Sequence, residues 1–130
     1  MALAINADIK KPRFGELTAA DLGSYDLLII GSPTQDGRYL PSINALLDAI
    51  VPDGLKGKKV AAFDTRHKWK FIKIWGYAAP LIAEKAKLKG GDIIAPPEAF
   101  FVGATKGPLI EGELEHAATW AKSIFEKASA

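Results

Sequence analysis

Two polar segments carry the residue types that could bind a small molecule. The first, Ser32-Pro33-Thr34-Gln35-Asp36-Gly37, follows an apolar run and places hydroxyl and amide groups beside a glycine that lets the backbone approach a ligand closely. These groups can hydrogen-bond a heteroaromatic ring, but any turn between a strand and a helix favours the same residues. The segment therefore indicates either a binding loop or an ordinary turn.

The second segment, Asp64 to Lys73, reads DTRHKWKFIK and holds four fixed cations, a histidine and a tryptophan within ten positions. It could hold a phosphate, an acidic partner or an aromatic ring stacked on Trp69. The alternative is a solvated loop that runs into a helix, with Trp69 or Phe71 packed against the core. A single basic loop with one aromatic residue is weak evidence for nucleic-acid binding.

No catalytic or metal-binding constellation accompanies these segments. His67 and His116 lack an acid–nucleophile neighbourhood and read as surface histidines, and the chain contains no cysteine. Glu111, Glu113 and Glu115 are explained as carboxylates that favour a helix N-terminus. Any reaction chemistry is therefore expected to come from a cofactor.

Composition bounds the class of protein. The 130 residues are 48% hydrophobic and carry a formal net charge of +2, which indicates one domain over residues 1–130 and makes a nucleic-acid partner unlikely. No apolar run reaches the roughly 20 residues that span a bilayer. The absence of cysteine fits a cytoplasmic protein.

Buried strands are predicted to alternate with amphipathic helices. The strands are expected at Tyr25–Ile30, Val60–Phe63, Asp92–Ala95 and Phe100–Val102, with a further short apolar segment at Ala2–Ile9. The predicted helices contain Ile43 to Ile50, Ile74 to Leu88 (closed by Gly90-Gly91) and Glu113 to Lys127, with Leu114, Ala117, Ala118, Ala121, Ile124 and Phe125 on one face of the last. Thr18 and Asp21 have the spacing of a capping box.

This alternation predicts an α/β fold with right-handed crossovers and a parallel sheet covered on both faces. Ligands of such sheets gather beyond the carboxyl ends of the strands. The segments Gly31–Tyr39, Asp64–Lys73 and Ala99–Leu109 are expected at that edge.

Four blocks resemble the later part of a flavodoxin in order and spacing. They are YDLLIIGSPTQDGR, LKGKKVAAFDTR, GGDIIAPPEAFFV and GPLIEGELEHAATWAKSI, and the resemblance covers roughly Asp21 to the C-terminus. It implies a doubly wound domain with strand order 2-1-3-4-5 that holds flavin mononucleotide and carries single electrons. Position by position, it implies a loop on one side of the flavin ring formed by Ser32, Pro33, Thr34, Gln35, Gly37 and Arg38. It places Asp64, Thr65 and Arg66 at the start of the loop on the other side, with Trp69 or Tyr39 as the stacking aromatic.

The sequence departs from that family before Tyr25. The first strand, the Ser/Thr/Gly-rich phosphate-binding loop and the first helix are missing, and Ala2–Ile9 corresponds to the second strand. The expected fold is thus N-terminally shortened, with about four strands. Either the N-terminal segment fills the gap, or a dimer partner supplies the missing element, or the chain is part of a longer protein. We hypothesise that Ala2–Ile9 fills the gap or forms a homodimer through it, because exposed sheet edges are usually covered.

The leading functional hypothesis is a flavodoxin-like electron carrier with a weakened or altered flavin mononucleotide site and a redox partner protein. The alternative is a flavodoxin-like interaction or regulatory domain that has lost flavin binding, and a flavin-dependent quinone reductase is a third reading. The cations after the second strand would favour an anionic reduced flavin. Alternatively, Arg66, Lys68 and Lys70 would grip the phosphate in place of the missing loop.

Overall fold

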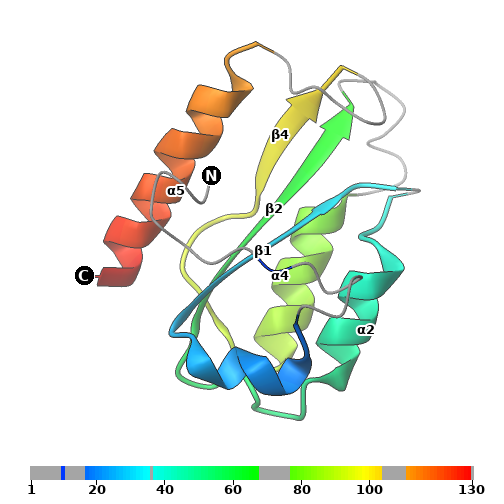
Figure 1. Ribbon diagram of the computed structural model, residues 1–130, viewed down its shortest axis with the longest axis vertical. Coiled ribbons are helices and arrows are strands. Elements are labelled where there is room, and N and C mark those ends of the chain that lie inside the picture. The colour runs from blue at the N-terminus through cyan, green and yellow to red at the C-terminus, as the bar shows by residue number, and fades with distance from the viewer. Residues whose placement is uncertain (1–9, 11–16, 36, 68–76, 104–110, 130) are drawn as a thin grey trace.

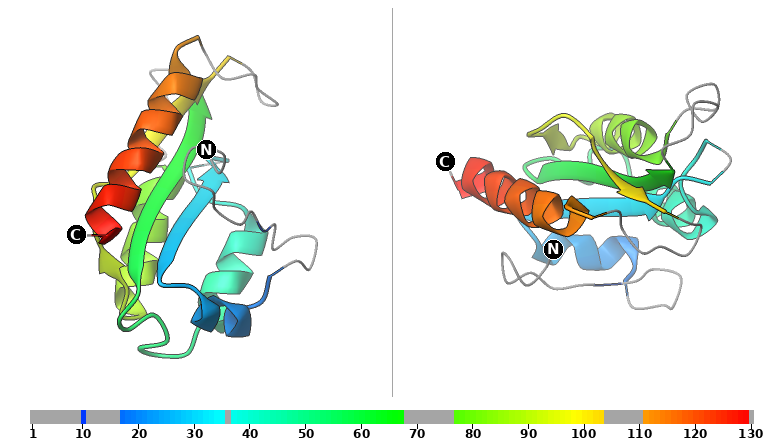
Figure 2. Two further views of the ribbon diagram at one scale, coloured as in Figure 1. Left: turned by 60° about the vertical axis from the view of Figure 1, so that its left-hand side comes forward. Right: turned by 90° about the horizontal axis from the view of Figure 1, so that it is seen from above.

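A computed structural model describes residues 10, 17–35, 37–67, 77–103 and 111–129. It shows a parallel sheet between two layers of helices (Figures 1 and 2). The strands are β1 (Leu27–Pro33), β2 (Lys59–His67), β3 (Asp92–Ile93) and β4 (Glu98–Val102). The helices are α2 (Pro41–Ala49), α4 (Ala78–Leu88) and α5 (Glu113–Ser129), and a 3-10 helix, η2 (Ala19–Ser24), precedes β1.

The strand β2 is central among the described strands. It pairs in parallel with β1 on one side and with β3 and then β4 on the other. The interruption between β3 and β4 contains Pro96 and Pro97. A proline has no N–H to donate, so the ladder along β2 stops there and resumes at Glu98.

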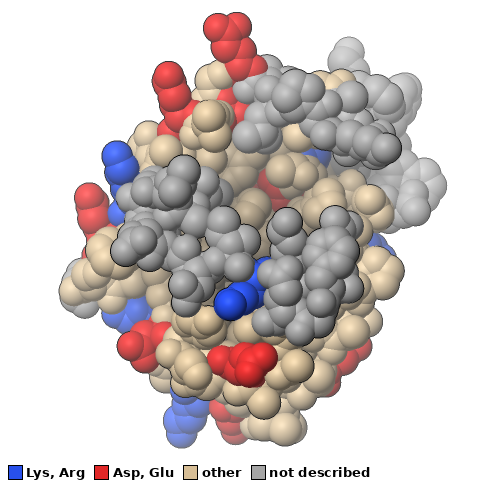
Figure 3. Space-filling model, viewed as in Figure 1, with Lys and Arg blue, Asp and Glu red and all other residues tan. Residues whose placement is uncertain are grey.

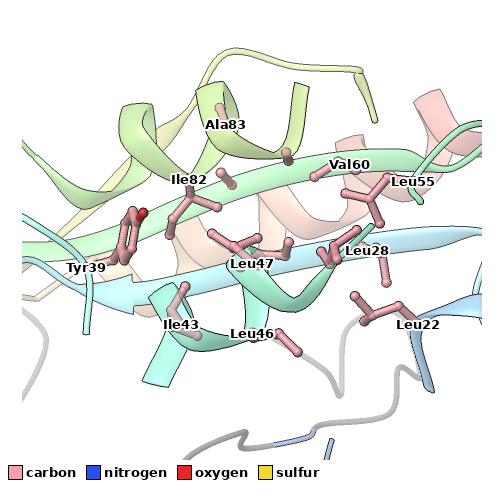
Figure 4. Close-up of a cluster of buried hydrophobic side chains, with 14 of the residues drawn as sticks. Leu22, Leu28, Tyr39, Ile43, Leu46, Leu47, Leu55, Val60, Ile82 and Ala83 are labelled. Atoms are coloured by element: carbon pink, nitrogen blue, oxygen red, sulfur yellow. The ribbon is translucent and has the colours of Figure 1, made fainter. Parts of the chain in front are cut away.

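The face of the sheet that carries α2 and α4 holds the larger core. Alternate residues of the strands, including Leu28, Ile30 and Val60, point into it and meet Leu47 and Ile82 from the two helices (Figure 4). The apolar side chains on this face of the strands are buried against the apolar stripes of α2 and α4. The sheet and these helices therefore form together.

The other face is covered by α5 and holds an aromatic core (Figure 2). The rings of Phe63, Phe100 and Trp120 contact one another edge to face, with centroids 5.8–5.9 Å apart. Phe63 also lies over Gly31, where an added Cβ would come within 2.0 Å of its ring. Glycine at position 31 is therefore required by this packing.

Most predicted elements are confirmed, with shifted bounds. The capping box is present, since the Thr18 N–H donates to the Asp21 carboxylate at 2.8 Å. Gly90 takes the left-handed conformation after α4, with φ at 95°. The segment Ala2–Ile9 lies outside the described residues.

One prediction about α5 is wrong in detail. Leu114 and Phe125 are 69% and 50% exposed rather than part of the buried face, and Trp120 is buried instead. The indole is wide enough to reach Phe63 and Phe100 across the sheet, so the helix rotates to bury Trp120. Within the described residues, no helix is long and apolar enough to cross a membrane.

Candidate functional site

The turn after β1 is a tight, hydrogen-bonded loop at the carboxyl edge of the sheet. The Gln35 N–H donates to the Arg38 carbonyl at 2.8 Å, and the Arg38 N–H donates back to Gln35 at 2.9 Å. Gly37 has a φ of 77°, a left-handed conformation that glycine adopts without strain. The side chains of Gln35 and Arg38 are exposed.

An open hollow of about 460 Å³ adjoins the turn. It is lined by Gln35, Arg38, Tyr39, Pro41 and Asn44, so the lining combines amide and guanidinium groups with an aromatic and a proline ring. The Tyr39 hydroxyl donates to Asn44 Oδ1 at 3.1 Å, and the Arg38 guanidinium lies 5.5 Å from the centre of the Tyr39 ring. This mixture can contact a planar, polar ring or an anionic group.

The side chains of Ser32 and Thr34 are used inside the protein. Buried Ser32 accepts a hydrogen bond from the Leu40 N–H at 2.9 Å, which fixes the start of α2. Thr34 Oγ1 accepts one from the Ala78 N–H at 3.0 Å at the start of α4. Both hydroxyls therefore satisfy amides of a helix N-terminus that would otherwise lack a partner.

Asp64 and Arg66 form a buried ion pair at the end of β2. The fully buried Asp64 carboxylate accepts two bonds from Arg66, from Nε at 2.7 Å and from the terminal nitrogen at 2.6 Å. It also accepts the Ala79 N–H at 2.9 Å. The central carbon of the guanidinium lies over the Tyr77 ring, 3.3 Å from its centre. Asp64 thus holds β2 to the N-terminus of α4, where a negative charge is favoured.

The expectation that Asp64, Thr65 and Arg66 begin a loop is wrong, because all three lie within β2. Asp64 and Thr65 pair with both β1 and β4, and Arg66 pairs with Phe101 of β4. Thr65 aligns with Pro33 of β1 and Phe100 of β4. Ser32 and Pro33 likewise belong to β1. Pairing on both sides of β2 extends the strand past the apolar run from which its end was predicted.

The structure brings nine of the ten predicted binding residues to one edge, where β1 and β2 end side by side (Figure 1). They are Ser32, Pro33, Thr34, Gln35, Gly37, Arg38, Asp64, Thr65 and Arg66, and a ligand role for them stays a prediction. Trp69 lies outside the described residues. The sequence did not predict Tyr77 and Asn44 as neighbours of this edge. Their contacts, with Arg66 and with Tyr39, arise from tertiary packing and not from a motif along the chain.

A polar network continues from the hollow along α2. Asn44 donates to Asp48 at 3.1 Å, and Asp48 forms an ion pair with Lys85 of α4. The hydrogen bond from Lys85 lowers the pKa of Asp48 below its ordinary value, and the same bond raises the pKa of Lys85. Charges of both signs are interspersed on the described surface in Figure 3, so no strongly basic face is visible there.

Among the described residues, His116 and the nearby carboxylates do not form a metal site. His116 lies 3.4 Å from carboxylate oxygens of both Glu98 and Glu113, with its ring centre 4.7 Å from that of Phe100. Glu113 also accepts the Phe101 N–H at 2.9 Å and so joins α5 to β4. No group of acidic or histidine side chains within the described residues could hold a metal ion.

Comparison with solved structures identifies the fold as flavodoxin-like. An oxidised Flavodoxin 1 from Bacillus cereus superposes with a TM-score of 0.70 at 21% identity, over 87% of this chain and 73% of that one. Flavodoxin 2 from Bacillus cereus gives 0.67 at 22% identity, over 85% and 73%. A flavodoxin from the domain Archaea gives 0.65 at 21% identity, over 90% and 75%. About a quarter of each of these chains has no counterpart here.

No family model matches the sequence, and no curated protein matches it either. The likeness at 21–22% identity is therefore one of fold.

Proposed function

We propose that this protein binds flavin mononucleotide at the carboxyl edge of the sheet and transfers single electrons to a partner protein. The observation that supports the proposal is the pair of hydrogen bonds between Gln35 and Arg38 beside a hollow, at the edge of a flavodoxin-like sheet where ligands of such sheets bind.

The described residues fit a flavin ring better than they fit its phosphate. The Gln35 amide and the Tyr39 ring line the hollow, with Tyr39 only 7% exposed, and the backbone at Gly37 lies in the adjoining turn. In contrast, the amides of Ala78 and Ala79 at the start of α4 are already bonded to Thr34 and Asp64. These two amides are therefore not free for a phosphate, and we propose a site weaker than one with a built phosphate loop.

Each residue of the edge has a distinct role in this proposal. Gln35 and the backbone at Gly37 hold the ring by hydrogen bonds, and Arg38 is the described cation nearest the hollow. Asp64 and Arg66 act indirectly, because their ion pair holds α4 in position. The side chains of Asp64 and Arg66 bond to each other and to Ala79, so they are not directed at a ligand. A bound flavin would supply the one-electron chemistry, for which the chain has no group of its own.

The ion pair changes the electrostatic expectation for the reduced cofactor. The Arg66 charge is matched by Asp64 at hydrogen-bond distance, so this cation contributes little net field at the edge. Any preference for an anionic reduced flavin must then come from Arg38 or from lysines outside the described residues. A partner protein is expected to dock over this same edge, where electrons have the shortest path to the ring.

A second candidate is a flavodoxin-like interaction or regulatory domain that does not bind flavin. One observation favours this candidate: the side chains of Ser32, Thr34 and Asp64 all accept hydrogen bonds from backbone amides at helix N-termini. An edge that is complete without a ligand could serve as a protein-binding surface.

Titration of flavin mononucleotide fluorescence with the purified protein separates the two candidates. Binding at the edge predicts saturable quenching with one flavin per chain and similar quenching of riboflavin, since no described residue is committed to the phosphate. A sample that leaves the fluorescence of both flavins unchanged at high micromolar protein would exclude the carrier and leave the interaction domain.

A further inference from the structure

Ser32 is a buried residue near the end of β1, next to the turn that carries the proposed flavin contacts. Its side chain is 4% exposed, and it is not among the residues that line the hollow beside Gln35 and Arg38. Any role of this serine in ligand binding must therefore be exerted through other residues.

The hydroxyl of Ser32 connects the two ends of the turn. It donates a hydrogen bond to the carbonyl of Pro33, where the turn begins, at 2.9 Å. It also accepts one from the N–H of Leu40, where the turn ends and α2 begins, at 2.9 Å. A single buried oxygen atom thus joins two backbone groups on either side of the turn.

Leu40 is the residue that this hydroxyl holds in place. It is the N-cap of α2, and its side chain has no oxygen with which to cap the helix. Its carbonyl accepts the N–H groups of Ile43 and Asn44 at 3.0 and 3.1 Å, while its own N–H bonds to Ser32. Ser32 therefore ties the first turn of α2 to β1.

The neighbours of Leu40 in the sequence form part of the wall of the hollow, which includes Arg38, Tyr39 and Pro41. The Tyr39 side chain packs in the larger core (Figure 4), so the shape of the hollow depends on how the backbone joins Tyr39 to α2. Without the Ser32 hydroxyl, the Leu40 N–H loses its partner, and a half-buried backbone donor requires one. The segment is then expected to turn toward water and to change the shape of the hollow.

We propose that Ser32 is a positioning residue for the flavin site, whose hydroxyl closes the turn after β1 and thereby sets the wall of the hollow in which the flavin ring binds. The inference rests on the proposed function for its ligand, but the closure of the turn is testable without flavin. Thr34 does not share this role, because its hydroxyl bonds to Ala78 of α4 and not to the far end of the turn.

Amide hydrogen exchange of Ser32→Ala tests the closure of the turn in the protein without ligand. Loss of the hydroxyl is expected to speed exchange at Gln35, Arg38 and Leu40 at least tenfold, because the turn opens more often. The matched control is Ser123→Ala, which removes a hydroxyl that bonds to the Trp120 carbonyl on α5 at 2.8 Å and should leave the three rates unchanged. Unchanged rates in Ser32→Ala would overturn the proposal.

Titration of the same variants with flavin mononucleotide tests the role in binding. Ser32→Ala should raise the dissociation constant about three- to tenfold, which corresponds to the loss of one hydrogen bond. Ser32→Thr keeps a hydroxyl and should stay within about twofold of the wild type, as should Ser123→Ala. Equal constants for Ser32→Ala and the wild type, or equal losses in Ser32→Ala and Ser32→Thr, would overturn the role of the hydroxyl in flavin binding.

The wild type separates a failure of this inference from a failure of the proposed function. If the wild type does not bind flavin, the proposed function is refuted and the role of Ser32 in flavin binding with it. The exchange rates of Ser32→Ala then still decide whether its hydroxyl closes the turn. If the wild type binds flavin and Ser32→Ala binds it equally well, only the role of Ser32 is refuted.

Discussion

At the scale of single residues, Asp64 stabilises the fold, although it was predicted to lie in a ligand-binding loop. Its carboxylate is fully buried and holds Arg66 and the first turn of α4. We predict that Asp64→Asn lowers the free energy of unfolding by about 3 kcal/mol, because Arg66 is left as a buried charge without its counter-charge. Urea denaturation followed by circular dichroism measures this change.

Asp48→Asn is the matched control, since it breaks an ion pair at the surface between Asp48 and Lys85. Solvent screens that pair, so the control should unfold at almost the same urea concentration as the wild type. Equal losses in the two variants would show that the Asp64 pair has no special role.

Arg38 is the residue at which the flavin proposal can be tested without disturbing the core. Its side chain is exposed beside the hollow. Arg38→Gln should raise the dissociation constant for flavin mononucleotide about two- to fivefold, the effect of one exposed charge contact of about 0.5–1 kcal/mol. Fluorescence titration measures this change, with Lys122→Gln as the control, because Lys122 is exposed on α5. An unchanged constant for Arg38→Gln would remove Arg38 from the site.

At the scale of elements, the packing of α5 depends on a glycine in the neighbouring strand. Gly31 leaves room for the Phe63 ring, which in turn contacts Trp120. We predict that Gly31→Ala costs about 1–3 kcal/mol of stability through overpacking. Gly23→Ala, where nothing lies within 4 Å of an added Cβ, should change it by less than about 0.5 kcal/mol. Thermal unfolding of both variants checks the difference.

The elements that sequence predicted well are those whose signal is local. The apolar run before Gly31, the helical stripe of Ile43, Leu46 and Leu47, and Gly90 after α4 each reflect burial or backbone freedom within one element. The end of β2 was misplaced because Thr65 and Arg66 are held in the strand by their neighbours in space. The burial of Trp120 depends on rings from two strands, which no pattern along α5 reveals.

At the scale of the whole molecule, the fold and the position of the candidate site follow from the alternation of strands and helices. The parallel sheet brings the ends of β1 and β2 together, as the rule for ligand edges requires. The partners of the polar side chains could not be predicted in the same way. Whether Ser32 and Asp64 face a ligand or a helix N-terminus is decided by how closely α2 and α4 approach the sheet, which depends on side-chain volumes throughout the core.

The most direct test of the proposed edge site is a map of backbone amide chemical shifts during titration with flavin mononucleotide. A flavin bound at this edge should cause saturable changes at Thr34, Gln35, Gly37, Arg38 and Tyr39, and none at the opposite edge of the sheet, at Lys58 and Asp92. An absence of shifts at saturating flavin, or shifts confined to residues away from the turn after β1, would contradict it.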